Sequence, residues 1–395
     1  MQSPDRPIAP PAPTATADEP TAAKADAGAD GLLTLHRLEP VPHRFPDLAW
    51  FFIGSQGIRA GWSALIFYAI YKILSPVLGT LALAIDPDLG KLDFSPGLVF
   101  FSDLIPLLAL VAAAGIVAML EGRKILDYNL RGPHRTFHFL TGMGVGFVAL
   151  SALIGVLHWS GWLHFGSVGL SGVGILKAGA LWALAFVTVG LVEEGSFRCF
   201  LQFTLTRGLN FWWALTTVSA ACAYLQFTAT GNGIRGVFLV AALGLLPCLL
   251  LELRKTPGSS FWPAAWVTST LFGTIHTSNN GENWIGIFAA SLIGFVFCVS
   301  VWATGSAWWA IGCHAAWDWG ETYFYGAADS GNVAVGHYLT TAPAGPALWS
   351  GGTDGPEGSL LVIPVVLVMM VVILLLYGRG RRAATSAPVA EPAAG

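Results

Sequence analysis

Residues 181–201 read LWALAFVTVGLVEEGSFRCFL and place three charged side chains inside one long apolar segment. A charged residue at the centre of a membrane-spanning helix costs about 2.5–3.5 kcal/mol, so such residues normally have a buried partner or a function. On a helix, Glu194 and Arg198 lie four residues apart on one face and can form an ion pair. Glu193 lies about a quarter-turn away and stays available for chemistry. The structural alternative is an ion pair that only stabilises a helix bundle, or a glutamate close to the lipid headgroups.

The composition of the whole chain agrees with a membrane environment. Of the 395 residues, 54% are hydrophobic and only 11% are charged, whereas soluble domains carry roughly 25% charged residues. The mean hydropathy is +0.63. The formal net charge is only −3, and the sequence contains no block of basic residues. We therefore expect no nucleic-acid partner. The 16 tryptophans and 24 phenylalanines are typical of a protein with aromatic belts at the lipid headgroups.

Three regions follow from the distribution of apolar residues. Residues 1–45 are rich in Pro, Ala and Asp, which predicts a disordered cytoplasmic tail, and residues 381–395 predict a second disordered tail. Residues 46–380 predict an all-α transmembrane bundle of about ten spans, each of about 20 residues. The predicted spans are 57–82, 97–120, 137–159, 174–203, 211–229, 236–253, 261–278, 284–303, 306–324 and 359–377.

The positive charges predict how the bundle is oriented. With ten spans, almost all Lys and Arg residues of the loops fall on the side of the two termini, which is the cytoplasmic side by the positive-inside rule. The N-terminal region has no apolar core typical of a signal peptide. We therefore expect a multi-pass protein of a bacterial inner or plasma membrane, in contact with the lipid bilayer. Loop 325–358 contains no Lys or Arg and is expected on the outer face, and the sequence predicts neither its role nor an oligomeric state.

Two more apolar segments carry polar side chains at helical spacing. His276 follows Phe272 by four residues near the end of one predicted span, and His314 precedes Asp318 by four residues in another. Each pair has a structural alternative, namely a histidine satisfied by packing and an interfacial helix with polar ends. If these structural alternatives were correct, the polar groups on three apolar helices would each need a separate explanation. One shared cavity accounts for all of them.

These residues form three motifs that resemble the signature of the CPBP family, which includes CAAX prenyl endopeptidases and bacteriocin-processing or immunity proteins. The family pattern is EExxxR, then FxxxH, then HxxxN or HxxxD. The chain supplies Glu193-Glu194-Gly-Ser-Phe-Arg198, Phe272-Gly-Thr-Ile-His276 and His314-Ala-Ala-Trp-Asp318 in that order. The resemblance covers roughly residues 105–325, including the basic segment EGRKILDYNLRG.

The chain departs from the family pattern in two places. About 70 residues separate Arg198 from Phe272, where the family usually places FxxxH on the helix directly after EExxxR. We interpret residues 211–253 as two extra helices, an even number that preserves the orientation of later spans. Cys199 stands where a glycine commonly follows the motif arginine, which we expect to alter packing rather than chemistry.

The resemblance implies an intramembrane endopeptidase that cleaves a membrane protein or peptide. Glu193 would be the general base that activates a water molecule, and His276 would position that water. Glu194 and Arg198 would hold the helix, His314 would stabilise the oxyanion, and Asp318 would orient His314. No cofactor is expected. For these roles Glu193, predicted near mid-span, and His276, predicted near the outer end of its span, must reach one cavity.

Three alternatives remain open at this level. Glu193, His276 and His314 could form a three-ligand zinc site, although the chain contains no HExxH motif. Buried Glu, His and Asp residues also occur in proton-coupled transporters. A non-catalytic membrane scaffold or immunity protein could retain the same residues.

Overall fold

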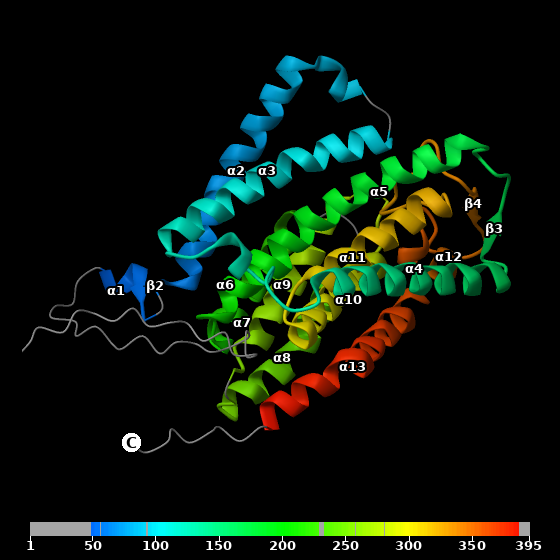
Figure 1. The fold of residues 1–395 in the computed structure, drawn as a ribbon. Helices are drawn as coiled ribbons and strands as arrows, with labels where there is room; N and C mark the ends of the chain where they lie inside the picture. The colour runs from blue at the N-terminus through cyan, green and yellow to red at the C-terminus, as the bar shows by residue number, and fades with distance from the viewer. Residues whose placement is uncertain are drawn as a thin grey trace, which may run out of the picture. The chain divides into compact units, whose positions relative to one another are not determined.

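Apolar helices make up almost all of the described chain in the computed structural model (Figure 1). The structure describes residues 49–55, 57–91, 94–228, 233–256, 258–279 and 281–386. One long helix corresponds to each of the ten predicted spans. These helices are α2 (Ala60–Ile85), α3 (Pro96–Leu120), α4 (Arg135–Trp159), α5 (Val173–Glu194), α7 (Phe211–Thr228), α8 (Ile234–Leu253), α9 (Phe261–His276), α10 (Trp284–Thr304), α11 (Trp308–Asp318) and α13 (Val362–Ser386).

The remaining elements are short. Three are α-helical, three are 3-10 turns, two are π-helical turns and four are strands. They are α1 (Ala49–Phe52), α6 (Gln202–Thr206) and α12 (Ala347–Ser350), then η1 (Pro87–Lys91), η2 (Ile125–Asp127) and η5 (Pro356–Gly358), then the π-helical η3 (Gly195–Leu201) and η4 (Trp319–Phe324), and finally β1 (Ile53–Gly54), β2 (Gly57–Ile58), β3 (Leu163–Phe165) and β4 (Thr341–Pro343). The tail predicted over 1–45 and residues 387–395 lie outside the described residues, and α13 continues past residue 381, where the second tail was predicted to begin.

The all-α prediction is confirmed, but the count of ten membrane spans is not. Within the described residues, six helical segments are long and apolar enough to cross a membrane. The other four fall short for separate reasons. α9 has 16 residues, and α11 has 11 residues, or 17 with the directly following η4. α7 includes three threonines, a serine and a glutamine, and the apolar part of α13 ends at Gly378. The six candidate spans are Ala60–Ile85, Pro96–Leu120, Arg135–Trp159, Val173–Thr206, Ile234–Leu253 and Trp284–Thr304.

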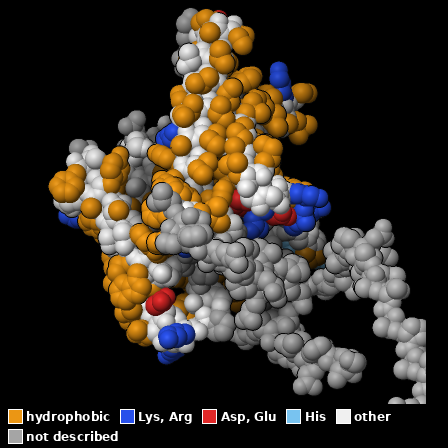
Figure 2. Space-filling view, turned by 90° about the vertical axis from the view of Figure 1, so that its left-hand side faces the viewer, with side chains coloured by type: hydrophobic (Ala, Val, Ile, Leu, Met, Phe, Trp, Pro, Cys, Tyr) orange, Lys and Arg blue, Asp and Glu red, His pale blue; other side chains and the backbone are white. Residues whose placement is uncertain are grey.

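The outward surface of the helices agrees with a lipid environment. Hydrophobic side chains cover most of the described face in Figure 2, and charged side chains are gathered at few places. On α2 alone, Leu65, Tyr68 and Ile73 are each more than half exposed. Large exposed apolar areas of this kind are rare on soluble monomers and are expected where lipid is the solvent.

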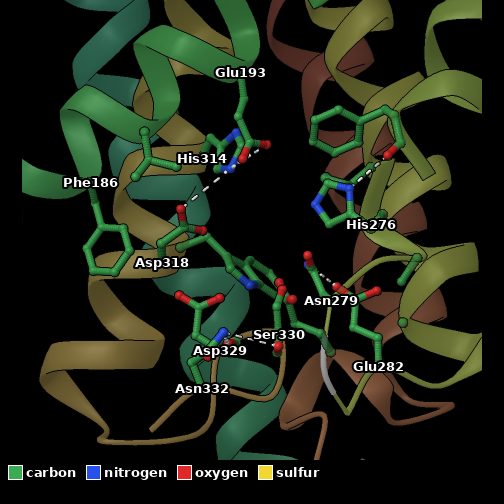
Figure 3. Close-up of a pocket in the computed structure, with 18 of the residues that line it drawn as sticks. Phe186, Glu193, His276, Asn279, Glu282, His314, Asp318, Asp329, Ser330 and Asn332 are labelled. Carbon is green, nitrogen blue, oxygen red and sulfur yellow. Dashed lines mark hydrogen bonds and ion pairs between the residues drawn. The ribbon is translucent and has the colours of Figure 1, made fainter. Parts of the chain in front are cut away.

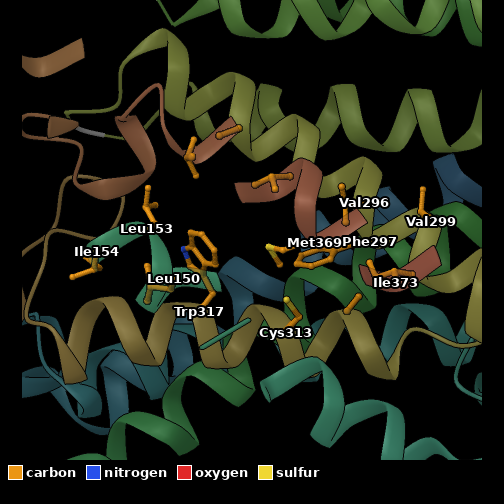
Figure 4. Packing of buried hydrophobic residues seen from close by; sticks show 14 of the residues in the cluster. Leu150, Leu153, Ile154, Val296, Phe297, Val299, Cys313, Trp317, Met369 and Ile373 are labelled. Atoms are coloured by element: carbon orange, nitrogen blue, oxygen red, sulfur yellow. The ribbon is translucent and has the colours of Figure 1, made fainter. Parts of the chain in front are cut away.

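Close packing of α4 against α11 fixes the position of the helix that carries His314. A Cβ added to Gly142 would lie 2.1 Å from the Trp309 carbonyl oxygen, and one added to Gly146 would lie 2.4 Å from the Cys313 carbonyl oxygen. On the other helix, a Cβ at Gly312 would lie 2.1 Å from the Phe139 carbonyl oxygen. Only glycine permits this approach, as is typical of membrane helix pairs. Apolar side chains of α4, α10, α11 and α13 form the adjoining core (Figure 4).

The segment between η4 and α13 folds back over the helix ends that surround the site. Strand β4 pairs antiparallel with β3, with Leu163 opposite Pro343. The Val335 amide donates to the Phe94 carbonyl at 3.0 Å, just before α3. Asn283, the N-cap of α10, donates its side-chain amide to the Gly358 carbonyl at 3.1 Å. Loop 325–358 is therefore anchored to three parts of the bundle.

Candidate active site

The EExxxR motif lies where α5 changes from an α-helix to a π-helical turn. Glu194 is the last residue of α5, and η3 begins at Gly195. Arg198 Nε lies 3.2 Å from Glu194 Oε2, and Arg198 Nη1 donates to Glu194 Oε1 at 3.3 Å, with both side chains fully buried. The guanidinium also lies 4.2 Å from the centre of the Phe272 ring. π-Helical turns inside α-helices occur frequently at functional sites.

His314 on α11 lies between carboxylates from two helices. Its Nδ1 donates to Glu194 Oε1 at 2.9 Å, because a carboxylate paired with arginine can only accept. Its Nε2 lies 3.5 Å from Asp318 Oδ2 and 3.8 Å from Glu193 Oε2. The first and third motifs, more than one hundred residues apart in the sequence, thus meet at one imidazole.

The FxxxH motif joins this group through both of its named residues. Phe272 packs against Arg198, as described above, and its ring lies 6.3 Å from the His314 ring. His276, the last residue of α9, donates from Nδ1 to the Phe272 carbonyl at 2.7 Å. Since this bond uses Nδ1–H, Nε2 is left as an acceptor in the neutral imidazole. This bond also fixes the orientation of the ring.

A cavity of about 320 Å³ brings the predicted reactive groups together. Glu193, His276, His314 and Asp318 all line it, and Figure 3 shows Glu193, His314 and Asp318 facing His276 across the hollow. Glu194 and Arg198 do not line the cavity and lie behind it, fully buried. The two adjacent glutamates of the motif therefore occupy different environments.

Several cavity residues were not among the predicted site residues. Asp103 of α3 lines the cavity, and it is the only charged residue within its span, a signal that could have identified it. The turn after α9 and loop 325–358 supply the others. These are Asn279, Glu282, Asp329, Ser330, Asn332 and Glu357. Asn279 and Glu282 directly follow the FxxxH motif, which was a signal for them, whereas nothing in the sequence indicated that residues of loop 325–358 reach the same cavity.

The acidic side chains of the turn after α9 and of loop 325–358 are largely buried. Burial raises the pKa of Glu282, of Asp329 and, most strongly, of Glu357. Thr322 donates to Asp329 Oδ2 at 2.7 Å, which opposes the effect of burial on that carboxyl. At Asp354, close to the N-terminus of α10, burial raises the pKa to about 7. Glu282, Asp329 and Glu357, which line the cavity, thus hold their protons more tightly than usual.

The alternative zinc set was tested against the positions of its ligands. Glu193, His276 and His314 all line the cavity. Across the described ranges, however, no group of three His, Cys, Asp or Glu side chains is positioned to hold a metal ion. The residues as placed do not fit zinc, so no step proposed below passes through a metal.

Taken together, the fold and the site define a class: a multi-pass membrane protein with a buried, carboxylate- and histidine-lined cavity. A family model described as "Type II CAAX prenyl endopeptidase Rce1-like" matches residues 247–320. The matched range includes the second and third motifs but not Glu193, Glu194 and Arg198. Over this range the chain is similar to type II CAAX prenyl endopeptidases, which agrees with the resemblance to the CPBP family that the motifs carry. No curated protein and no solved structure matched the chain.

Proposed function

We propose that the chain is an intramembrane endopeptidase in which Glu193 activates a water molecule to hydrolyse a peptide bond. The observation that carries the proposal is the position of the Glu193 carboxylate. Its Oε2 atom is buried beside the cavity and has no hydrogen-bond partner among the described residues. A carboxylate with no Lys or Arg beside it among the described residues, 3.8 Å from His314 Nε2 and next to a space for substrate, is available to take a proton.

In the proposed first step, a water molecule binds between Glu193 and His276. Glu193 takes a proton from this water while the water oxygen forms a bond to the carbonyl carbon of the substrate. His276 Nε2 accepts the second water hydrogen and so aligns the oxygen, because its Nδ1–H is held by the Phe272 carbonyl. Alignment of the reacting atoms accounts for a large part of the rate increase in such reactions.

In the second step, the tetrahedral intermediate collapses. His314, protonated on both nitrogens, donates from Nε2 to the oxyanion, and its position is supported by the Nδ1–H bond to Glu194 and by Asp318. The C–N bond then breaks, and Glu193 transfers its proton to the leaving nitrogen. The products are a carboxylic acid and an amine, and Glu193 is again ionised.

Glu194 and Arg198 have a positioning role in this proposal. Their ion pair neutralises one carboxylate in the apolar interior and presents Glu194 Oε1 to His314. The Phe272 ring against the guanidinium couples the helix of His276 to the same pair. None of these groups is assigned a bond-making step.

The environment of the site supports a membrane-associated protein or peptide as the substrate. The cavity is lined by apolar residues of α10 and α13 as well as by the reactive groups, so an apolar segment can enter it. Counted over all ten predicted helices, the distribution of Lys and Arg favours both termini in the cytoplasm, and the proposed location is a bacterial inner or plasma membrane.

The test is hydrolysis of internally quenched apolar peptides by the purified full-length protein in lipid nanodiscs. Wild type, Glu193→Gln and Glu193→Ala are compared, each with and without a metal chelator. Cleavage that disappears in both variants and is unchanged by the chelator supports the proposal. Loss with chelator and recovery with zinc would instead support a metal site, and folded protein that cleaves no peptide would favour a transporter or a scaffold.

A further inference from the structure

Helix α10 carries none of the three motifs, yet one of its faces reaches the centre of the site. Gly294 and Phe297 lie three residues apart and therefore on the same face of this helix. Phe297 lines the cavity and is only 3% exposed, within the core that Figure 4 shows. Contacts of these two residues with Arg198 and His314 make α10 a further element of the site.

The Arg198 guanidinium is surrounded by aromatic rings as well as by its carboxylate partner. Nε and Nη1 face Glu194, whereas Nη2 is buried with no hydrogen-bond partner among the described residues. The guanidinium carbon lies 4.2 Å from the centre of the Phe272 ring, 5.4 Å from that of Phe297 and 5.7 Å from that of Phe197. The face of an aromatic ring is negative and attracts a cation, most strongly where water is excluded. Rings from α9, α10 and η3 therefore stabilise the charge on the side that has no acceptor.

Gly294 leaves the space that this guanidinium occupies. A Cβ added to Gly294 would lie 2.4 Å from Arg198 Nη2, closer than two such atoms approach in proteins. A larger side chain at this position would move the guanidinium away from Glu194. Helix α10 therefore fixes Arg198 in two ways, by the space at Gly294 and by the ring one turn later.

The same Phe297 ring also lies against His314. The two ring centres are 5.9 Å apart and the ring planes differ by 26°, which is an offset-stacked arrangement. His314 bonds Glu194 through Nδ1 and directs Nε2 toward Asp318, and these interactions lie in the plane of the imidazole. The contact with Phe297 restricts the orientation of that plane. Phe297 is itself held by the Trp309 ring of α11, at 6.4 Å between centres.

We propose that Phe297 is a further positioning residue of the site, whose aromatic face holds both the Arg198 guanidinium and the protonated His314 ring. The inference rests on the proposed endopeptidase function, in which His314 donates to the oxyanion. Such a donor is effective only if it is aimed before the reaction begins. The property that matters is the negative face of the ring, because an aliphatic side chain of similar size fills the space without attracting a cation.

The test changes the charge distribution of this ring and leaves its shape almost constant. Fluorine withdraws electron density from the ring face and so weakens the attraction to a cation. Mono-, di- and trifluorophenylalanine are placed at position 297 of the full-length protein by nonsense suppression. Hydrolysis of internally quenched apolar peptides is then measured in nanodiscs. We expect kcat to fall with each added fluorine, on the order of tenfold for the trifluoro ring, and KM to stay near its wild-type value because the cavity keeps its shape.

Phe295 provides the matched control. It lies on the same helix, contacts the Trp262 ring at 6.0 Å and is outside the described lining of the cavity. The same fluorinated series at position 295 changes the apolarity of a side chain in the same way and should leave kcat unchanged. Phe297→Leu, which removes the ring, should lower kcat at least as much as the trifluoro ring.

A second measurement does not depend on turnover. The attraction between Phe297 and Arg198 contributes to stability whether or not a peptide is cleaved, so the thermal unfolding midpoint should fall along the series at 297 relative to the series at 295. In an Arg198→Met background this trend should become smaller, since one of the two cations is absent.

The outcomes separate this inference from the proposed function. A kcat that stays constant along the series at 297, or that changes equally at 295, overturns the positioning role even though peptides are cleaved. A fall in kcat and in the midpoint confined to position 297 supports it. If the midpoint shows this trend and no peptide is cleaved, the contact of Phe297 with the cations stands and the peptidase proposal fails.

Discussion

Two of the buried acidic centres in the described part of the chain differ in their surroundings. At one, Glu121 directly after α3 accepts from Ser63 and lies 2.7 Å from Arg207 Nη1 and 3.1 Å from Arg123 Nε, so one carboxylate meets two arginines. At the other, Glu193, Glu194 and Asp318 surround His314, and Arg198 bonds only Glu194. The first centre joins α2, α3 and the end of α6, and Glu121 does not line the site cavity. The second borders that cavity.

The difference shows how a structural ionic cluster is distinguished from a reactive one. A carboxylate that is fully paired with arginines, such as Glu121, stabilises the contact between helices. Its oxygens are occupied and are not available to take a proton from a substrate. A carboxylate beside a cavity that has no arginine or lysine partner lowers stability locally and gains the capacity to take a proton. The predictions below test this difference by substituting residues at or near one of the two centres.

The largest expected effect is on activity at Glu193. Replacement by glutamine removes the proposed base, and kcat should fall by about 10²–10⁴-fold, the usual contribution of such a group. The thermal unfolding midpoint should stay the same or rise, because the substitution removes one of three neighbouring carboxylates. Peptidase rates and thermal unfolding in nanodiscs measure both. A clear drop in the midpoint would place Glu193 with the structural charges instead.

The next largest effect is on stability at Arg198. Arg198→Met leaves the Glu194 carboxylate in the apolar interior without its cation, at a cost of about 3–5 kcal/mol of unfolding free energy. The double variant Arg198→Met/Glu194→Gln should recover much of this loss, because it removes the unpaired charge as well. The free energies of unfolding of the wild type, the two single variants and the double variant, measured in mixed micelles, complete this double-mutant cycle. Equal stability of the single and double variants would show that the pair is not coupled.

A smaller effect is expected at the structural centre. Glu121→Gln weakens the charge-assisted contacts to Arg123 and Arg207 and should cost about 1–3 kcal/mol of unfolding free energy. The kcat of the folded fraction should remain at the wild-type value, since Glu121 does not line the cavity. Parallel activity and unfolding measurements check this. A loss of kcat comparable to that of Glu193→Gln would remove the distinction between the two centres.

The last prediction concerns the pH dependence of loop 325–358, a local effect confined to that loop. The pKa of Asp354 is raised by burial from 3.8 to about 7, so the folded loop retains a proton that the opened loop releases. The loop is then most stable below about pH 4, loses stability as the pH rises to about 7, and changes little above that value. Hydrogen exchange over residues 351–358, corrected for intrinsic rates, should show this trend. Asp354→Asn should reduce the slope, and an unchanged slope would contradict the assignment.

The same contrast explains how far the site could be predicted from the sequence. The spacing of Glu194 and Arg198 is enough to predict their pairing, because residues four apart share a helix face. The three motifs together predicted one shared cavity. The count of spans was less predictable, because α9 and α11 are apolar yet too short to cross a membrane, and their ends pass into a turn and a π-helical segment. Local composition does not reveal where such a helix stops.

By itself, the sequence determined the all-α character, the apolar surface and the motif residues, since all of these depend on composition and on the 3.6-residue period. Only the tertiary structure decided that Glu193 faces a cavity while Glu194 faces Arg198 and His314. Only the tertiary structure added Asp329 and Glu357 from a distant loop to the same cavity. The physical reason is that a cavity is formed by packing between elements far apart in the chain. The spacing of residues within one helix determines the face on which a side chain lies. The fold determines which residue of another helix that side chain contacts.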